Sequence, residues 1–138
     1  MPDEARQLKL VHSAPLPATV LVIDDDPDMV ESLAMMLGDH GFPVLTANDG
    51  VRGLEMFREY KPAVVLTDIL MPEQDGIEVI MTMRRERPGV KIIAISGSGR
   101  IGSTDFLTMA RKLGADAAFE KGRNASELLE LLKAMLRP

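Results

Sequence analysis

Short runs of apolar, mostly β-branched residues alternate along this chain with longer amphipathic stretches. This alternation is typical of a parallel sheet built from strand–helix–strand units, with helices on both faces. The run at Ala63–Thr67 is almost continuously apolar, which favours burial on both faces and a place at the centre of the sheet. Five strands are predicted, at Thr19–Ile23, Val44–Ala47, Ala63–Thr67, Lys91–Ile95 and Ala117–Phe119.

Capping residues mark the ends of five predicted helices. Asp26 suits an N-cap and Pro27 suits a first turn, so the first helix is expected from there to about His40. Asn124 suits the N-cap of the last helix, where Glu127 would complete a capping box. The remaining helices are predicted from Asn48-Asp49 to about Tyr60, over Ile77–Arg87 and over Thr104–Leu113, and the last one runs through Leu136.

The length of 138 residues and the composition describe one globular domain. Residues 1–18 show no sustained period, so we interpret them as a flexible lead-in and residues 19–138 as the domain. The sequence holds no cysteine, which excludes a disulfide scaffold and favours the cytoplasm. Its apolar runs are too short for a membrane span. The net charge of −5 argues against a nucleic-acid partner and favours a cation.

Polar residues, most of them acidic, follow the predicted strands. Asp24-Asp25-Asp26 follow the first strand, Asp68 the third, Ser96 the fourth and Glu120-Lys121 the fifth. In an open parallel sheet, ligands bind outside the carboxyl ends of the strands. Carboxylates that meet there repel one another unless a cation lies among them, and oxygen ligands suit Mg²⁺. A carboxylate beside Mg²⁺ can accept a phosphoryl group, with Ser96 and Lys121 contacting the phosphoryl oxygens.

Four separated blocks resemble the receiver domain of bacterial two-component response regulators. They are VIDDDP at 22–27, LTDILMPEQDG at 66–76, Ile95-Ser96-Gly97, and GADA at 114–117 ahead of Lys121. Agreement of four blocks in the right order is more specific than any one motif. The resemblance covers about residues 19–137. It implies an α/β fold, a single doubly wound five-stranded parallel sheet of flavodoxin-like order 2-1-3-4-5 with five helices.

The resemblance also implies a role for each site residue. Asp68 would be the phosphoacceptor, Asp25 a direct Mg²⁺ ligand, Asp24 a ligand through water, and Leu70 a ligand through its backbone carbonyl. The phosphoryl donor would be a histidine kinase or a histidine phosphotransfer protein. The chain would be a stand-alone switch more than an enzyme, with only self-phosphorylation and self-dephosphorylation chemistry. An unknown downstream protein would bind the face of the fourth helix, fifth strand and fifth helix.

The chain departs from the family pattern at two positions. Ala118 stands where receivers carry an aromatic switch residue, and Phe119 is expected to point to the opposite face of the sheet. Gly122 replaces the usual proline after the lysine. Both changes concern how phosphorylation is reported at the surface. The last helix, 124–136, has more apolar positions than one buried stripe requires. This excess predicts one of two arrangements: the helix presents a surface to a partner or, in a homodimer, to a second copy of the chain, or it packs closely against the core of its own domain.

Two enzyme-like alternatives remain open at the level of sequence. Asp24-x-Asp26 imitates the nucleophile and acid of haloacid-dehalogenase-type phosphatases, which would carry the phosphoryl group on Asp24. Gly97–Gly102 matches a GxGxxG dinucleotide fingerprint, although one later strand is too little for that type of domain. A third cluster, Arg84, Arg85 and Arg87, is interpreted as a solvated helix face.

Overall fold

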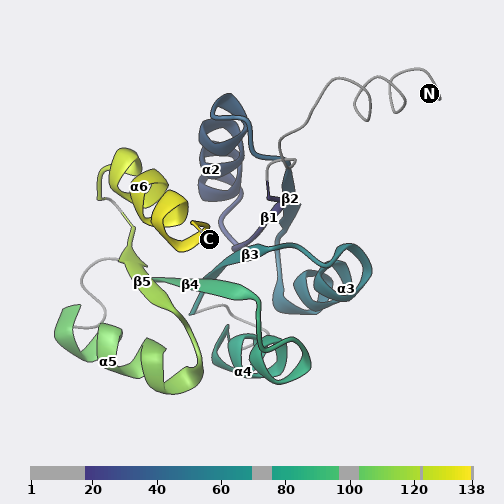
Figure 1. Cartoon of the computed structure of the whole chain (residues 1–138), viewed down its shortest axis with the longest axis vertical. Coiled ribbons are helices and arrows are strands. Elements are labelled where there is room, and N and C mark those ends of the chain that lie inside the picture. Colours follow the sequence, from purple (N-terminus) through teal and green to yellow (C-terminus); the bar gives the residue numbers. More distant parts are fainter. Residues whose placement is uncertain (1–17, 70–75, 97–102, 122, 138) are drawn as a thin grey trace.

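The computed structural model describes residues 18–69, 76–96, 103–121 and 123–137. Within these ranges five parallel strands form one sheet of order β2-β1-β3-β4-β5, with five helices around it (Figure 1). The predicted fold class and strand order are therefore confirmed. The strands are β1 (Val20–Ile23), β2 (Val44–Ala47), β3 (Val64–Asp68), β4 (Lys91–Ser96) and β5 (Ala117–Glu120). The helices are α2 (Pro27–Asp39), α3 (Gly50–Tyr60), α4 (Gly76–Glu86), α5 (Ser103–Leu113) and α6 (Ala125–Met135).

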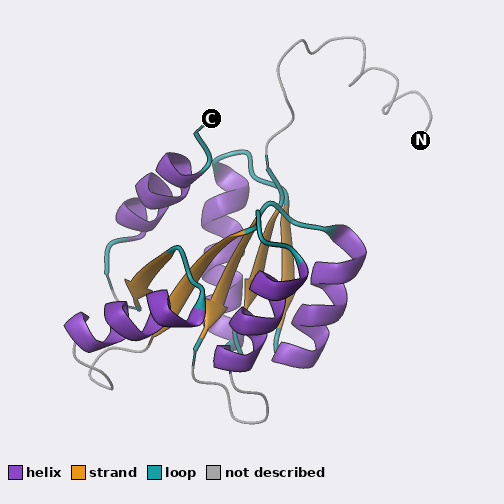
Figure 2. Ribbon diagram, turned by 60° about the horizontal axis from the view of Figure 1, so that its bottom comes forward, coloured by secondary structure: helices purple, strands orange, loops and turns teal. Residues whose placement is uncertain are grey.

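The helices form two layers, one on each face of the sheet. Helices α2 and α6 cover one face, and α3, α4 and α5 cover the other (Figures 1 and 2). Alternate residues of each strand face opposite layers. Val20 and Val22 pack with the α2 and α6 side chains, whereas Leu21 and Ile23 pack with α3 and α4. β1 and β3 are fully buried, as the almost continuous apolar run at Ala63–Thr67 predicts for the middle of the sheet.

Local capping explains where the helices begin. The Asp26 carboxylate accepts a hydrogen bond from the Asp28 N–H at 3.0 Å, with Pro27 in the first turn of α2. Asn124 caps α6 through the Ser126 N–H at 2.9 Å, as predicted. The Glu127 carboxylate, expected to complete a capping box, instead pairs with Arg123 at 2.6 Å.

Each helix in the described part of the chain is too short to cross a bilayer.

The expectation that Arg84 lies on a solvated helix face is wrong. Its guanidinium donates to the carbonyl oxygens of Gly114, Pro88 and Val90 at 2.9, 2.6 and 2.7 Å. It also pairs with Asp116 at 2.6 Å, and the same carboxylate oxygen of Asp116 accepts the Ile92 N–H. Arg84 therefore joins the end of α4 to the start of β4 and the turn before β5.

Arg87 also differs from the expectation, whereas Arg85 is exposed as predicted. The Arg87 guanidinium lies 4.8 Å from the centre of the Phe57 ring on α3, a cation–π contact. Burial there lowers the pKa of Arg87. The basic run is thus one solvated residue between two that fasten α4 to its neighbours.

The leucines of α6 belong to the core. Leu128, Leu129 and Leu132 are buried against β-strand residues and α2, and the apolar residues beside them are half-buried. Of the two alternatives for this helix, the one in which it wraps closely around its own core holds. The large apolar side chains that are exposed in the described residues lie on α2, α3 and α4 instead: Met35, Val51, Tyr60 and Met81.

Candidate functional site

Two buried carboxylates meet at the carboxyl edge of the sheet. β1 and β3 pair in parallel with Ile23 beside Thr67, which places Asp24 next to Asp68 on neighbouring strands. Asp24 is 1% exposed and Asp68 is 4% exposed. The Asp24 Oδ1 atom accepts a hydrogen bond from the Asp26 N–H at 3.0 Å, which holds this carboxylate in place at the start of α2. Two acids so close and so buried require a nearby positive charge.

Lys121 supplies that charge from the end of β5. Its Nζ lies 3.1 Å from Asp68 Oδ2, a hydrogen bond, and 2.9 Å from Asp24 Oδ2. The contact to Asp24 is an ion pair without hydrogen-bond geometry, so Asp24 Oδ2 is a buried oxygen that lacks a hydrogen-bond donor. The Lys121 N–H also donates to the Ser96 carbonyl at 2.8 Å. The lysine is thus fastened to β4 by its backbone and to β1 and β3 by its side chain.

The surroundings shift the pKa values of these groups in the same direction. Burial raises the pKa of the Asp24 carboxyl from 3.8 to about 6, although the Asp26 N–H and Lys121 lower it, and the charge of Asp68 adds to the increase. Burial alone lowers the pKa of Lys121, but its contacts with Asp24 and Asp68 outweigh burial and raise it. Lys121 therefore remains a cation at neutral pH. Asp24 is ionised at neutral pH, but burial makes its charged form less favourable than it is in water.

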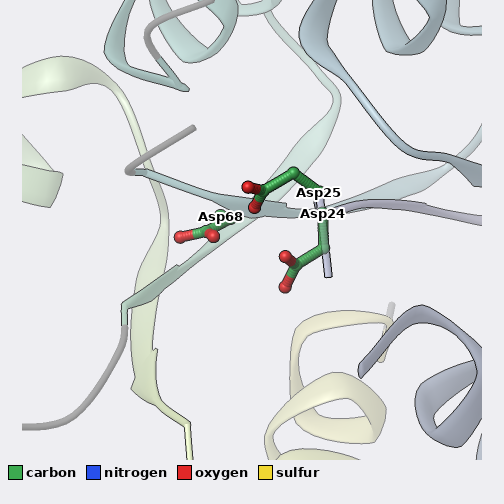
Figure 3. A group of neighbouring side chains, drawn as sticks. All are labelled: Asp24, Asp25 and Asp68. Atoms are coloured by element: carbon green, nitrogen blue, oxygen red, sulfur yellow. The ribbon is translucent and has the colours of Figure 1, made fainter. Parts of the chain in front are cut away.

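The third acid, Asp25, completes a group that can hold a metal ion. Carboxylate oxygens of Asp24, Asp25 and Asp68 all lie within 4.8 Å of one another. Figure 3 shows these side chains gathered at the ends of β1 and β3. Asp25 is exposed, so the group opens to solvent on that side. Three carboxylates with room for water are a donor set that a hard divalent cation prefers.

Two further residues of the expected site have described positions. Ser96 ends β4 and is 1% exposed, and its strand pairs with β3 so that Asp68 lies beside Ile95. Gly76 begins α4 with its N–H donating to the Ile69 carbonyl at 3.0 Å. A side chain at this glycine would place its Cβ 2.2 Å from the Asp68 carbonyl oxygen. Only glycine lets α4 start so close to the strand that carries Asp68.

Four of the sequence predictions lie outside the described residues. They concern the lead-in, of which residues 1–17 are not described, the Leu70 carbonyl, Gly122 and the GxGxxG segment at 97–102. The strand order nevertheless argues against the dinucleotide alternative. A dinucleotide-binding domain has the order 3-2-1-4-5-6, whereas this sheet has the order 2-1-3-4-5 of flavodoxin-like folds.

The phosphatase alternative does not fit the geometry around Asp26. In that interpretation Asp26 is the acid that acts beside Asp24. Here the Asp26 carboxylate is exposed and caps α2, and Asp26 contacts Asp24 through its backbone N–H. The position of Phe119 is as predicted. Its ring packs with the α2 and α6 layer, whereas Ala118 faces the opposite layer.

The arrangement agrees with known proteins in sequence and in structure. The family model for the response regulator receiver domain matches residues 20–133. The chain is 30% identical over 121 residues to the probable transcriptional regulatory protein TcrX of Mycobacterium tuberculosis, covering 88% of this chain and 50% of TcrX. It is 36% identical over 118 residues to the transcriptional regulatory protein PrrA of Mycobacterium bovis, covering 86% and 49%.

A solved response regulator receiver domain protein from Clostridium thermocellum superposes with a TM-score of 0.78 at 29% identity, covering 86% of this chain and 94% of that one. The chain spans about half the length of the two curated relatives. The match to the family model extends from β1 into α6 and includes the acidic edge of the sheet. This chain therefore belongs to the receiver domains of response regulators, the signalling switches of two-component systems.

Proposed function

We propose that residues 19–138 accept a phosphoryl group on Asp68 from a histidine kinase or a histidine phosphotransfer protein, with Mg²⁺ as cofactor. The observation that carries the proposal is the contact of Lys121 with two buried carboxylates, 2.9 Å from Asp24 and 3.1 Å from Asp68. A half-buried lysine between two buried acids at the carboxyl edge of a parallel sheet is suited to bind an added anion.

The donor set supports a role for Mg²⁺. Asp25 and Asp68 would hold the ion directly, together with the Leu70 carbonyl, and Asp24 would hold it through water. The support for the last contact is Asp24 Oδ2, a buried oxygen that lacks a hydrogen-bond donor and would accept from a metal-bound water. The ion would supply charge neutralisation when bound, because the cluster contains three carboxylates and one lysine.

The proposed reaction transfers the phosphoryl group from nitrogen to oxygen. An Asp68 oxygen forms a bond to phosphorus while the bond from phosphorus to the donor histidine nitrogen breaks, and the electron pair remains on the imidazole. Lys121 then pairs with one phosphoryl oxygen and the Ser96 hydroxyl donates to another. Attack of water on phosphorus returns the Asp68 carboxylate and releases phosphate, which is the self-dephosphorylation step.

The conformational response to phosphorylation would begin when Lys121 loses its contacts to Asp24 and Asp68. When its ammonium moves to the phosphoryl group, the contacts with Asp24 and Asp68 are replaced, and the end of β5 changes its attachment to β1 and β3. We expect this shift to change the populations of two conformations of the face made of α5, β5 and α6, where a downstream protein would bind. Ala118 offers no ring to rotate, so we expect this change to travel by Lys121 and the β4 backbone to which it is bonded, by the segment 97–103 and by helix packing.

The test is intact-mass analysis after incubation with Mg²⁺ and a small-molecule phosphodonor. We expect the mass of one phosphoryl group to be added, to be absent in Asp68→Asn, and to be retained in Asp26→Asn. Peptide mapping after borohydride reduction locates the modified aspartate. Modification on Asp24, or equal modification of the Asp68→Asn variant, would contradict the proposal.

A further inference from the structure

A cavity of about 130 Å³ is lined by residues of α2, β5 and α6. Helices α2 and α6 cover the same face of the sheet (Figure 1). Its walls are mostly apolar and include Met29, Leu33 and Met36 of α2, Phe119 of β5 and Leu128 of α6. An enclosed cavity of similar size with wholly apolar walls takes up benzene, so this volume is enough for one aromatic ring. Two thioethers give these walls the ability to adjust to an aromatic ring.

The charged groups that line the cavity are basic, and Ser32 adds one neutral hydroxyl. Lys121 and Arg123 line it, and no acidic side chain is among the described residues that do so. The Lys121 ammonium is engaged with Asp24 and Asp68, so its aliphatic stem forms the wall. Arg123 is different: its side chain is 56% exposed, and its guanidinium lies 5.7 Å from the centre of the Phe119 ring.

Arg123 can change its partner at little cost. In the structure it pairs with Glu127 at 2.6 Å, but both side chains are at least half exposed. Ion pairs of that kind contribute little to stability, because water competes for both charges. A carboxylate held at the mouth of the cavity would therefore displace Glu127 readily.

We propose that this cavity binds a small aromatic monocarboxylate of about the size of benzoate. The ring lies among Met29, Met36 and Phe119, and the carboxylate remains at the mouth, paired with Arg123. The volume sets the size of the ring, and the absence of acids among the described lining residues together with Arg123 sets the sign of the charge. The cavity shares Lys121 with the acidic site, but the proposal does not depend on phosphoryl acceptance by Asp68.

The test compares three probes that share one benzene ring, by NMR titration of the isotopically labelled full chain: benzoate, toluene and benzylamine. We expect benzoate to shift the signals of Phe119 and Leu128 with a dissociation constant of about 1 mM, as a ligand of this size permits. Toluene should bind about fivefold more weakly, and benzylamine more weakly still. Arg123→Gln should reduce benzoate binding to the level of toluene and leave toluene unchanged.

A matched pair of variants on α6 locates the binding. Ala125 is exposed and lines the cavity, so Ala125→Phe should block it, whereas Ala134→Phe, at an exposed position of the same helix away from the cavity, should bind as the parent does. Circular dichroism checks that both variants fold. The proposal is overturned if benzoate fails to saturate by about 10 mM, if toluene binds as tightly as benzoate, or if the two variants affect binding equally.

Discussion

Replacement of Asp24 by asparagine should stabilise the metal-free protein at neutral pH. Burial raises the pKa of Asp24 from 3.8 to about 6, so the folded state resists the ionised form of this residue. The difference is roughly two pKa units, which corresponds to about 3 kcal/mol of unfolding free energy. Asparagine removes the charge and keeps an oxygen that can accept the Asp26 N–H. We therefore expect Asp24→Asn to raise the free energy of unfolding by about 2–3 kcal/mol at pH 7.

The difference in unfolding free energy between the parent and Asp24→Asn should depend on pH. Between about pH 4 and pH 6 the folded parent binds more protons at Asp24 than the unfolded chain does, so its stability falls as the pH rises through this window. The variant lacks that fall. The two proteins should thus differ little below pH 4, diverge between pH 4 and 6, and differ by a constant amount above pH 6.

Urea unfolding followed by far-ultraviolet circular dichroism, in the presence of a chelator, measures both curves. Asp25→Asn is the matched control, since Asp25 is exposed and its charge is not desolvated. Mg²⁺ should reverse the order at pH 7, because it binds the folded parent and offsets the repulsion. A variant that is no more stable than the parent at pH 7, or a difference that does not change with pH, would refute the reasoning.

Three further predictions concern the metal, Lys121 and the half-buried Arg84. In calorimetric titrations, Asp25→Ala should weaken the binding of Mg²⁺ about 100-fold and Asp24→Ala about tenfold. The reason is that Asp25 would contact the ion directly, whereas Asp24 would contact it through water. Equal losses of affinity would contradict this assignment. Lys121→Ala should still accept a phosphoryl group in the intact-mass assay. Phosphorylation of this variant should leave the hydrogen exchange of β5 and α6 unchanged. If the variant instead fails to accept the phosphoryl group, Lys121 is catalytic and the prediction is wrong. Arg84→Met should lose about 2–3 kcal/mol of unfolding free energy, since it removes the donor to several carbonyls and leaves the Asp116 carboxylate with the Ile92 N–H but without its cation. The exposed control Arg85→Met should change the free energy of unfolding by about 0.5 kcal/mol or less, and similar losses in both variants would show that the Arg84 contacts contribute little.

Phe119 places the aromatic ring of β5 on the face of the sheet that α6 covers. The ring faces α2 and α6, and Arg123 lies over it. The face of the sheet that meets α5 receives the small side chain of Ala118 instead. A change at Lys121 therefore has an aromatic neighbour on the α6 side of β5, two residues away in the chain, and the α6 layer is where we expect the first response to appear.

The sequence alone determined the fold and the members of the acidic site. Apolar runs of four to six residues, alternation along each strand and capping residues such as Asp26 are local signals, and each was read within a few positions of the chain. Because parallel strands end at one edge of the sheet, residues that follow β1, β3 and β5 had to come together there. The same alternation is enough to place Phe119 and Ala118 on opposite faces of the sheet.

Only the tertiary structure decided the energies and the contacts between distant segments. The burial of Asp24, and with it the raised pKa, depends on layers that pack from both sides of the sheet, which no local pattern reports. Arg84 reads as one more charge on a polar helix, yet its partners Gly114 and Asp116 lie 30 and 32 residues further along the chain. The cavity beside Phe119 likewise arises from how α2 and α6 meet over the sheet. Helical period and capping act over single turns, whereas burial and long-range contacts are properties of the packed chain.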